Sequence, residues 1–286
     1  AITFDSQIGK KLPISDLLHS GRKYNHENHK LCVIVPFRES EDNINQGKGR
    51  TKQLELFLEY MPRFFKSTDI HNYEIIVTEQ TQGYRFNKGA IMNAAFAMSF
   101  HSCDYFAFHD VDLLPLSLTN RYTYPTNPRR QISSVKDHYL SETDLDDIDL
   151  TDDHLGGVLM ITNDQYVATN GYSNAYWGWG FEDADVRTRI LMSGFNIDYA
   201  KGEAGVYRQL PHERVFFGDH YSTLGGEARW GWDYSSLLRD GFVNHRAEGL
   251  RSLDATLVKV LKNAPKLKHF VFEIHSAFGR GDKDYQ

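Results

Sequence analysis

The chain is 286 residues long, with 41% hydrophobic and 24% charged residues and a formal net charge of −6. This composition is typical of a globular protein with one large α/β domain or two small ones. A negative net charge argues against a protein that binds nucleic acid or an anionic membrane surface through its overall charge. No apolar stretch of the sequence reaches the ~20 residues that cross a bilayer, so we expect no membrane span in this chain.

The N-terminal part, residues 1–30, is polar and predicts an extension with one short helix near residues 14–18. Residues 31–37 (LCVIVPF) are continuously apolar, which is typical of a strand buried on both faces. After a hydrophilic insertion, residues 39–52, an amphipathic segment from Leu54 onward predicts a helix. The folded domain is therefore expected to begin at residue 31.

Strands and helices continue to alternate beyond this point. Residues 73–78 predict a strand, residues 88–100 a helix with Ala, Met and Phe at helical spacing, and residues 105–111 another strand. This βαβαβ order implies a Rossmann-like α/β fold, with a mostly parallel central sheet, right-handed crossovers and helices on both faces.

The strand at residues 105–111 delivers two acids one residue apart, Asp110 and Asp112. Because side chains alternate along a strand, both acids would project from one face while Val111 points into the core. Hard oxygen ligands suit Mg²⁺ or Mn²⁺ bridged to substrate phosphates, and open α/β sheets bind ligands at the carboxyl ends of their strands. The alternative is an ordinary acidic turn after a strand.

Residues 117–153 contain many turn formers and an acidic segment, residues 142–153. We expect a mobile surface loop there, with a solvated acidic face of no functional role as the alternative. The sheet resumes at residues 155–161, where a glycine pair permits close approach of a ligand or a neighbouring chain. The two cysteines, Cys32 and Cys103, lie in or beside predicted core strands and are either buried small hydrophobes or one disulfide.

Aromatic residues, glycines and acids are concentrated in residues 174–185. Aromatic faces beside flexible glycines suit sugar rings. Glu182 and Asp183 begin a predicted helix that runs to Ser193 and is ended by Gly194. They could simply cap that helix, since its dipole favours acids there. The functional interpretation makes one carboxylate a general base that accepts a proton from an acceptor hydroxyl.

A third metal ligand would have to come from elsewhere in the sequence. His212 is the best placed of the thirteen histidines because it follows the last predicted core strand. A histidine considered alone is more often a surface or packing residue, so its assignment depends on the pattern described next.

Five motifs, in order, resemble the β-1,4-galactosyltransferase family, with the xylosylprotein branch that builds the proteoglycan linker as the nearest likeness. They are PFR at 36–38, FNKGA at 86–90, HDVDLLP at 109–115, GGV at 156–158 and WGWGFED at 177–183. Residues 246–253 (RAEGLRSL) look like a further family segment, and the likeness covers roughly residues 31–275. It implies an inverting, Mn²⁺-dependent transferase with a UDP-sugar donor and a GT-A fold, in one catalytic domain at residues 31–286. The donor-binding half would span about 31–116 and the acceptor-binding half about 117–275.

The resemblance also implies roles for individual residues. Asp183 would be the catalytic base, and Asp112 and His212 the metal ligands. The nucleotide would be bound by Pro36, Phe37, Arg38, Phe86, Lys88, Asp110 and Val111. The donor and acceptor sugars would contact Trp179, Gly180, Glu182, His154 and Gly157. Residues 202–229 would form a long loop that closes after the donor binds.

The chain departs from the family pattern at several positions. Ser40 replaces the second arginine after PFR, for which Arg50 could substitute after realignment. Lys88 keeps the charge of the family's arginine but lacks its bidentate fork. Ala184 replaces an acid that would contact the acceptor, and Gln209 lies where a second metal-binding Met or His is expected.

The donor is the least determined feature, because His154 replaces a tyrosine that helps to exclude a bulky substituent at C2. We expect UDP-galactose, with UDP-GalNAc as the alternative, and a xyloside, GlcNAc or another glycan as acceptor. A catalytically inactive sugar-binding relative and a sugar-nucleotide hydrolase are the rival classes. By resemblance the protein would be a trimmed luminal domain in the Golgi if eukaryotic, and otherwise cytoplasmic.

Overall fold

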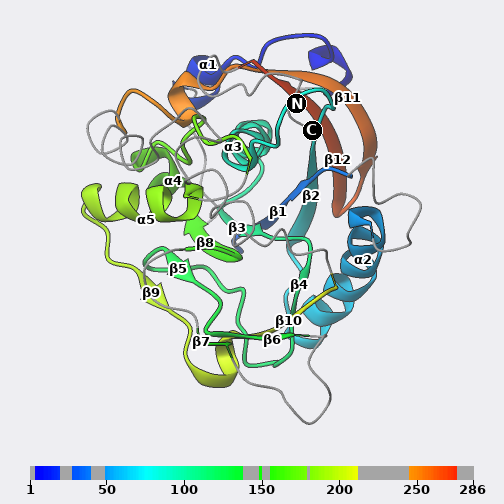
Figure 1. Cartoon of the computed structure of the whole chain (residues 1–286), viewed down its shortest axis with the longest axis vertical. Helices are drawn as coiled ribbons and strands as arrows, with labels where there is room; N and C mark the ends of the chain where they lie inside the picture. Colours follow the sequence, from blue (N-terminus) through cyan, green and yellow to red (C-terminus); the bar gives the residue numbers. More distant parts are fainter. Residues whose placement is uncertain are drawn as a thin grey trace, which may run out of the picture.

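The computed structural model describes residues 4–19, 28–39, 49–137, 148–149, 155–178, 181–211 and 245–275. Within them, eight strands form a mixed sheet of order β11-β12-β2-β1-β3-β8-β5-β9 (Figure 1). The strands are β1 (Leu31–Phe37), β2 (Tyr73–Gln80), β3 (Tyr105–His109), β5 (Arg129–Arg130), β8 (Val158–Thr162), β9 (Asp198–Tyr199), β11 (Ala255–Ala264) and β12 (Leu267–Ile274). The four central strands β12, β2, β1 and β3 are parallel, and β8 pairs antiparallel with β3.

Helices pack on both faces of this sheet. The α-helices are α1 (Ile14–His19), α2 (Arg50–Ser67), α3 (Lys88–Ser99), α4 (Asn163–Ala168) and α5 (Glu182–Met192), and the short 3-10 helices are η1 (Phe4–Gln7), η3 (Gly202–Gly205) and η4 (Leu250–Ser252). Val33 and Val35 of β1 share a buried cluster with α2, whereas Cys32 and Ile34 share another with α3. Every residue of β1 is buried. The run of apolar residues in β1 is continuous because alternate side chains pack against different helices, so both faces of the strand are buried as predicted.

A second sheet of four short strands lies beyond the carboxyl end of β3, in the order β4-β10-β6-β7 (Figure 1). Its members are β4 (Leu113–Pro115), β6 (Ser134–Asp137), β7 (Ile148–Asp149) and β10 (Val206–Gln209). The sequence did not predict this sheet, because strands of two to four residues are too short for a period of two to emerge. It matters for the site because β4 directly follows Asp112.

The α/β fold with a mostly parallel centre and helices on both faces is confirmed. The strand at 31–37 is correct at both ends, and the helix from Glu182 ends at Met192, one residue before its predicted end, with Gly194 in the left-handed region at φ 84°. The hairpin of β11 and β12, which adds two strands beside β2, was not foreseen. Most of the acidic segment 142–153 and most of the expected closing loop lie outside the described residues, although β7 and β10 fall within these two segments.

The strand that carries the paired acids is shorter than predicted. It ends at His109, not at Val111, so Asp110 and Asp112 lie in the turn between β3 and β4. The Asp110 N–H donates to Gly157 O (2.9 Å) as a last bond to the neighbouring chain, and the Leu113 N–H donates back to Asp110 O (3.3 Å). The turn nevertheless keeps the predicted separation of side chains, because Val111 is 4% exposed and packs in the core.

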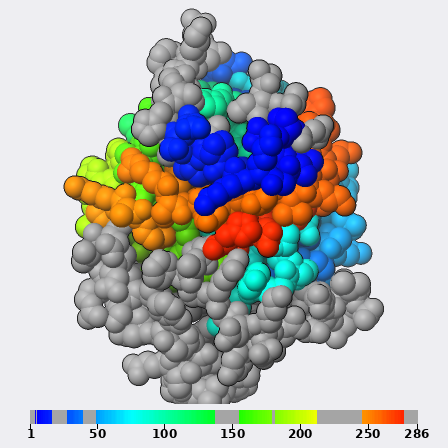
Figure 2. Space-filling view, turned by 90° about the horizontal axis from the view of Figure 1, so that it is seen from above, coloured from blue at the N-terminus to red at the C-terminus, as the bar shows by residue number. Residues whose placement is uncertain are grey.

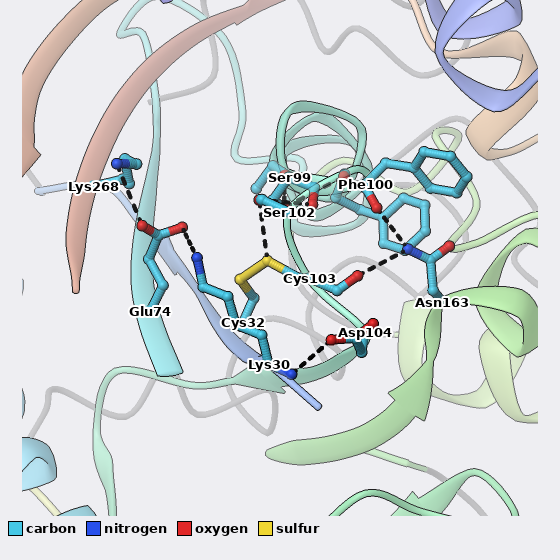
Figure 3. Close-up of a disulfide and its surroundings, with 12 residues drawn as sticks. Lys30, Cys32, Glu74, Ser99, Phe100, Ser102, Cys103, Asp104, Asn163 and Lys268 are labelled. Carbon is cyan, nitrogen blue, oxygen red and sulfur yellow. Dashed lines mark hydrogen bonds and ion pairs between the residues drawn. A yellow bond between two sulfur atoms is a disulfide. The ribbon is translucent and has the colours of Figure 1, made fainter. Parts of the chain in front are cut away.

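A disulfide joins Cys32 to Cys103, with a Cα–Cα distance of 5.8 Å (Figure 3). It ties the amino-terminal end of β1 to the residue that precedes β3 by two positions. Cys32, Cys103 and the buried Glu74 lie close enough to suggest a metal site. However, the sulfurs are bonded to each other, and Glu74 is paired with Lys30 (3.4 Å) and Lys268 (3.3 Å), so we assign this cluster to structure rather than metal binding.

The N-terminal residues that the structure describes pack along β11 (Figure 2). The N–H groups of Gly9 and Leu12 donate to Leu257 O (2.8 Å) and Ala255 O (2.9 Å), and Leu12 and Ile14 are buried in the core beside α3. In the described part of the chain, none of the helices has the length and apolar character needed to traverse a membrane.

Candidate active site

The candidate site lies where the carboxyl ends of β1 and β3 meet the amino-terminal ends of α3 and α5. Pro36 lies near the end of β1, past Ile34, the last β1 residue that pairs with β3. Its missing N–H therefore leaves no gap in the ladder to β3. Asn87 is the N-cap residue of α3, and its side chain accepts a hydrogen bond from the Ala90 N–H (2.9 Å). This cap fixes the first residue of the helix, Lys88.

Lys88 reaches three acids from two different elements. Its Nζ atom lies 3.0 Å from Oδ1 of Asp110, which follows β3, and 3.5 and 3.6 Å from carboxylate oxygens of Glu182 and Asp183, which begin α5. The Lys88 side chain is 17% exposed, and those of Glu182 and Asp183 are 11% and 23% exposed. The structure thus brings together four predicted site residues that are up to 95 positions apart in the sequence.

The charge of Lys88 is determined by these neighbours. Burial acts to lower the pKa of its ammonium, but Asp110, Asp183 and Glu182 outweigh burial and hold this pKa well above its usual value. The lysine is therefore fully charged. A permanent cation at this point keeps the acids from the two elements close together although they repel one another.

Asp112 faces a different cation. Its Oδ2 atom lies 3.3 Å from Nη1 of Arg50, at the start of α2, and its side chain is 10% exposed. Arg50 also donates to Gln53 Oε1 (3.1 Å), and its backbone N–H donates to the Glu39 carboxylate (3.1 Å). The structure therefore places Arg50, which follows the hydrophilic insertion, beside Asp112.

An aromatic and cationic wall borders the site on the β1 side. The guanidinium carbon of Arg38 lies 5.4 Å from the centre of the Phe86 ring. The Nη1 atom of the same guanidinium group donates a hydrogen bond to Tyr84 O. The Gly178 N–H donates to Phe86 O (2.7 Å), which joins the glycine-rich segment to this wall. Flat aromatic and guanidinium faces of this kind can stack on a nucleobase. Phe37, at the end of β1, is 5% exposed, and its ring lies edge-on to that of His269 of β12, with the ring centres 6.3 Å apart.

The start of α5, which carries Glu182 and Asp183, is anchored by an ion network that the sequence did not reveal. Arg189 is 1% exposed, donates to Asp185 through Nε, and donates to Glu248 Oε2 through Nη2 (2.7 Å). Glu248 also accepts from the Asn174 N–H (2.6 Å). The i, i+4 spacing of Asp185 and Arg189 was the one available signal, but it is common on exposed helices. The distant partner Glu248 could not be read from local sequence.

The glycine before β8 has a packing role. Gly157 has a φ of +88°, and an added Cβ would lie 2.2 Å from Ile132 Cδ1 and 2.9 Å from Leu113 Cδ1. The side chains of Ile132 and Leu113, rather than a ligand, therefore account for the close approach to this glycine. The Gly157 carbonyl accepts the hydrogen bond from the Asp110 N–H, so Gly157 also fixes the start of the acidic turn.

Several expected site residues lie outside the described residues: His154, Trp179, Gly180 and His212. Gln209 is described and ends β10, where it pairs with Leu113 of β4 and Asp137 of β6. The next residue donates its N–H to Asp112 O (2.6 Å), so the chain that leads to His212 passes directly beside the acidic turn.

The arrangement of the sheet, the acidic turn and α5 defines a GT-A-type glycosyltransferase fold. A Drosophila β-1,4-galactosyltransferase 7 variant, solved with manganese, UDP-Gal and xylobiose, superposes with a TM-score of 0.65 over 87% of this chain and 95% of that one, at 24% identity. Two family models match, "N-terminal region of glycosyl transferase group 7" at residues 16–125 and "N-terminal domain of galactosyltransferase" at residues 142–213, together more than half of the chain.

Curated relatives give the same family. Human β-1,4-galactosyltransferase 7 is 34% identical over 184 residues, 64% of this chain and 50% of the relative. The xylosylprotein 4-β-galactosyltransferase of Caenorhabditis elegans is 34% identical over 178 residues, 61% of this chain and 54% of the relative. The aligned part spans about half the length of these curated relatives. The chain belongs to the β-1,4-galactosyltransferase family.

Proposed function

We propose that the chain is an inverting, metal-dependent glycosyltransferase that moves galactose from UDP-galactose to a sugar hydroxyl in β-1,4 linkage. A xyloside is the acceptor that we favour, because one relative is named for xylosylprotein and another was solved with xylobiose. The activity, the donor and the acceptor of those relatives are the source of this proposal, and the site geometry supports it.

The observation that carries the proposal is the meeting of two acidic groups across Lys88. Asp110 lies 3.0 Å from the lysine ammonium on the strand side, and Glu182 and Asp183 lie 3.5 and 3.6 Å away on the helix side. A diphosphate-binding turn and a sugar-binding helix end are then adjacent, as transfer from a UDP-sugar requires. Packing alone offers no reason to gather four charged groups at one edge of a sheet.

The donor set near the acidic turn fits Mn²⁺. Asp112 offers a carboxylate that is held in place by Arg50, and Leu210 brings the chain that leads to His212 to the backbone of Asp112. We propose Asp112 and His212 as ligands, since carboxylate oxygen and imidazole nitrogen both suit this ion. A bound Mn²⁺ supplies positive charge that stabilises the departing UDP. Gln209 pairs with Leu113 of β4, and we do not assign it as a ligand.

The protein's own groups account for the remaining chemistry. Asp183 accepts the proton of the acceptor hydroxyl as that oxygen attacks C1 of the sugar from the face opposite the leaving UDP. Glu182 holds donor hydroxyls, with Trp179 and Gly180 covering the sugar. Arg38, Phe37, Phe86 and Pro36 bind the uridine, and Asp110, with Val111 beneath it, borders the ribose. The Lys88 ammonium lies 3.5 and 3.6 Å from the Glu182 and Asp183 carboxylates and offsets their mutual repulsion.

The test is a donor and acceptor comparison. UDP-Gal, UDP-GalNAc and UDP-Glc are incubated with Mn²⁺ and with xylosides, GlcNAc or glucosides, and the products are identified by mass spectrometry and NMR. We expect β-1,4-linked galactose on a xyloside. A preference for UDP-GalNAc would indicate that His154 determines which donor is accepted, and it would contradict the proposal that galactose is transferred.

The same experiment separates the rival classes. Release of free sugar without transfer to any acceptor would identify a hydrolase. Absence of turnover with every donor, in protein that still binds UDP, would identify an inactive sugar-binding relative. Either result contradicts the transferase proposal.

We further propose that the protein acts in the oxidising lumen of the secretory pathway, at the Golgi. The Cys32–Cys103 disulfide supports this location, because such bonds persist in oxidising compartments and are rare in the cytosol. Alkylation of the protein from its native source, followed by mass spectrometry, should find both cysteines oxidised. Two free thiols would contradict the location.

A further inference from the structure

Three buried polar side chains lie beneath the acidic turn and have no part in the proposed chemistry. His109 is the last residue of β3, Tyr122 lies in the chain between β4 and β5, and Tyr207 belongs to β10. Each is 0% exposed. Burying an imidazole and two hydroxyls is costly unless they bond to one another, so their arrangement needs an explanation.

The three side chains form one continuous hydrogen-bond chain. His109 Nδ1 lies 2.8 Å from Asp110 O, His109 Nε2 lies 2.8 Å from Tyr122 Oη, and Tyr122 Oη lies 2.8 Å from Tyr207 Oη. Because a carbonyl oxygen only accepts, Nδ1 carries the proton and Nε2 accepts from Tyr122. Tyr122 then has no further proton to give, so its 2.8 Å contact with Tyr207 uses the single proton of Tyr207, whose hydroxyl also lies 3.2 Å from a second acceptor, Asn120 Oδ1. The direction of the two bonds from Tyr122 to the Asp110 carbonyl is thereby fixed.

None of these groups changes charge in the ordinary pH range. Burial lowers the pKa of His109 to about 4, although its bond to Asp110 O and the Asp110 carboxylate oppose the effect. Burial also raises the pKa values of Tyr122 and Tyr207 well above their usual range. The chain therefore acts through geometry, not by carrying a proton.

The acidic turn is attached to β10 at a second point as well. The Leu210 N–H donates to Asp112 O (2.6 Å), and Gln209 pairs with Leu113. Both acids are thus linked to β10 through their backbone carbonyls. The Asp110 carbonyl is linked through His109 and Tyr122 to Tyr207 of β10, and the Asp112 carbonyl is bonded directly to Leu210, the residue after β10. Packing adds rigidity, since the His109 ring meets Phe57 edge-on at 4.9 Å and lies parallel to Tyr122 at 5.9 Å.

We propose that His109, Tyr122 and Tyr207 are positioning residues that hold the Asp110–Asp112 turn in register with β10, so that both acids are ready for a divalent cation and a nucleoside diphosphate. The inference rests on the proposed function and adds to it a specific requirement: the affinity for Mn²⁺ and UDP depends on two tyrosine hydroxyls that touch neither ligand.

The test compares tyrosine-to-phenylalanine variants, which remove one oxygen each and keep the ring. Tyr122→Phe interrupts the hydrogen-bond chain at its centre, and Tyr207→Phe removes its start. Tyr105→Phe is the matched control, because the Tyr105 hydroxyl is buried in the same core and donates to the Tyr122 carbonyl (2.9 Å) but not to the chain. Dissociation constants for Mn²⁺ in the presence of UDP are measured by calorimetry or EPR, with the unfolding midpoint of each variant.

We expect Tyr122→Phe to weaken Mn²⁺ binding by about tenfold, at the lower end of what outer-shell changes cause. Tyr207→Phe should weaken it less, since the Tyr122–His109 bond survives, and Tyr105→Phe should lower the midpoint without changing affinity. The inference would be overturned if Tyr105→Phe weakened Mn²⁺ binding as much as Tyr122→Phe, or if neither Tyr122→Phe nor Tyr207→Phe changed the affinity. In both cases the proposed function would stand, because the wild-type protein still binds Mn²⁺ and UDP. A wild-type protein that binds neither Mn²⁺ nor UDP would overturn both.

Discussion

The candidate site joins two acidic regions that are built in different ways. The strand-side region is the turn that holds Asp110 and Asp112, and it is fixed by backbone bonds to Gly157 and Leu210 and by neutral buried side chains. The helix-side region is the start of α5 with Glu182 and Asp183. It is fixed by a buried ion network around Arg189, which is 1% exposed.

The difference matches what each region would do under the proposed function. An acid that binds a metal must keep its position while a charged ligand arrives and leaves, and a backbone ladder supplies that rigidity. An acid that acts as a base must reach a hydroxyl, and in α5 a different acid, Asp185, makes the ion pair that anchors the helix start. Lys88 contacts both regions.

The largest predicted effect concerns the anchor of the helix side. Arg189→Met should cost about 3 kcal/mol of unfolding free energy, because it leaves the buried Asp185 carboxylate without its cation and removes the partner of the partly exposed Glu248. Arg63→Met is the matched control, since Arg63 forms the same i, i+4 pair with Glu59 (2.9 Å) but is 77% exposed, and it should cost only about 0.5 kcal/mol. Urea unfolding measures both. Similar losses in the two variants would show that the buried network does not anchor α5.

The disulfide provides the second prediction, for a place remote from both regions. Replacing Cys32 and Cys103 together by alanine should cost about 2–4 kcal/mol, since the bond closes a 71-residue separation in the unfolded chain. Transfer activity at 25 °C should not change, because the bond lies at the amino-terminal ends of β1 and β3 and the site at their carboxyl ends. A loss of activity in folded protein would mean that the two ends of the sheet are coupled.

The third prediction tests the link between the regions. Lys88→Met should lower kcat/KM for the donor by roughly 10–100-fold, because the charged hydrogen bond to Asp110 and the ion pairs with Glu182 and Asp183 are lost. Lys88→Arg keeps the charge and should recover most of this loss. If the arginine variant were as impaired as the methionine variant, the shape of the side chain rather than its charge would be what matters.

The smallest effect is expected at the residue before α5. Phe181 has a φ of 70° and a side chain that is 37% exposed. Phe181→Gly should change stability by less than about 1 kcal/mol, since relief of the left-handed strain is offset by the greater chain entropy of glycine. Thermal unfolding measures the change, and a loss above about 2 kcal/mol would mean that the aromatic ring packs on an essential neighbour.

The two regions also differ in how far they could be predicted. The acidic turn was foreseen because its information is local: an apolar run, two acids and a β-strand period. Even so, the end of β3 was placed two residues too late, since the bonds that close the turn come from Gly157 and Leu113. The helix start was foreseen from composition and resemblance, whereas its anchor depends on Glu248, 59 positions beyond Arg189, and no local pattern carries such a contact.

Short and late strands escaped prediction for the same reason. The strands of the second sheet have two to four residues, and β10 is recognisable only through its partners β4 and β6. The consequence for function is direct, because β10 carries Tyr207 and borders Asp112. The predicted proximity of residues 110–112 and 209–212 came from family resemblance, and the structure supplies its physical basis up to Pro211.

Asp183 provides the most direct measurement of the central claim, that the helix side does the chemistry and the strand side binds the metal and nucleotide. We predict that Asp183→Asn lowers kcat for galactose transfer by about 10²–10⁴-fold while the affinities for UDP and Mn²⁺ stay near those of the wild-type protein. Asp164→Asn, an acid in the first turn of α4, is the matched control and should leave both unchanged. Retained transfer by Asp183→Asn, or loss of UDP and Mn²⁺ binding along with activity, would contradict this division of roles.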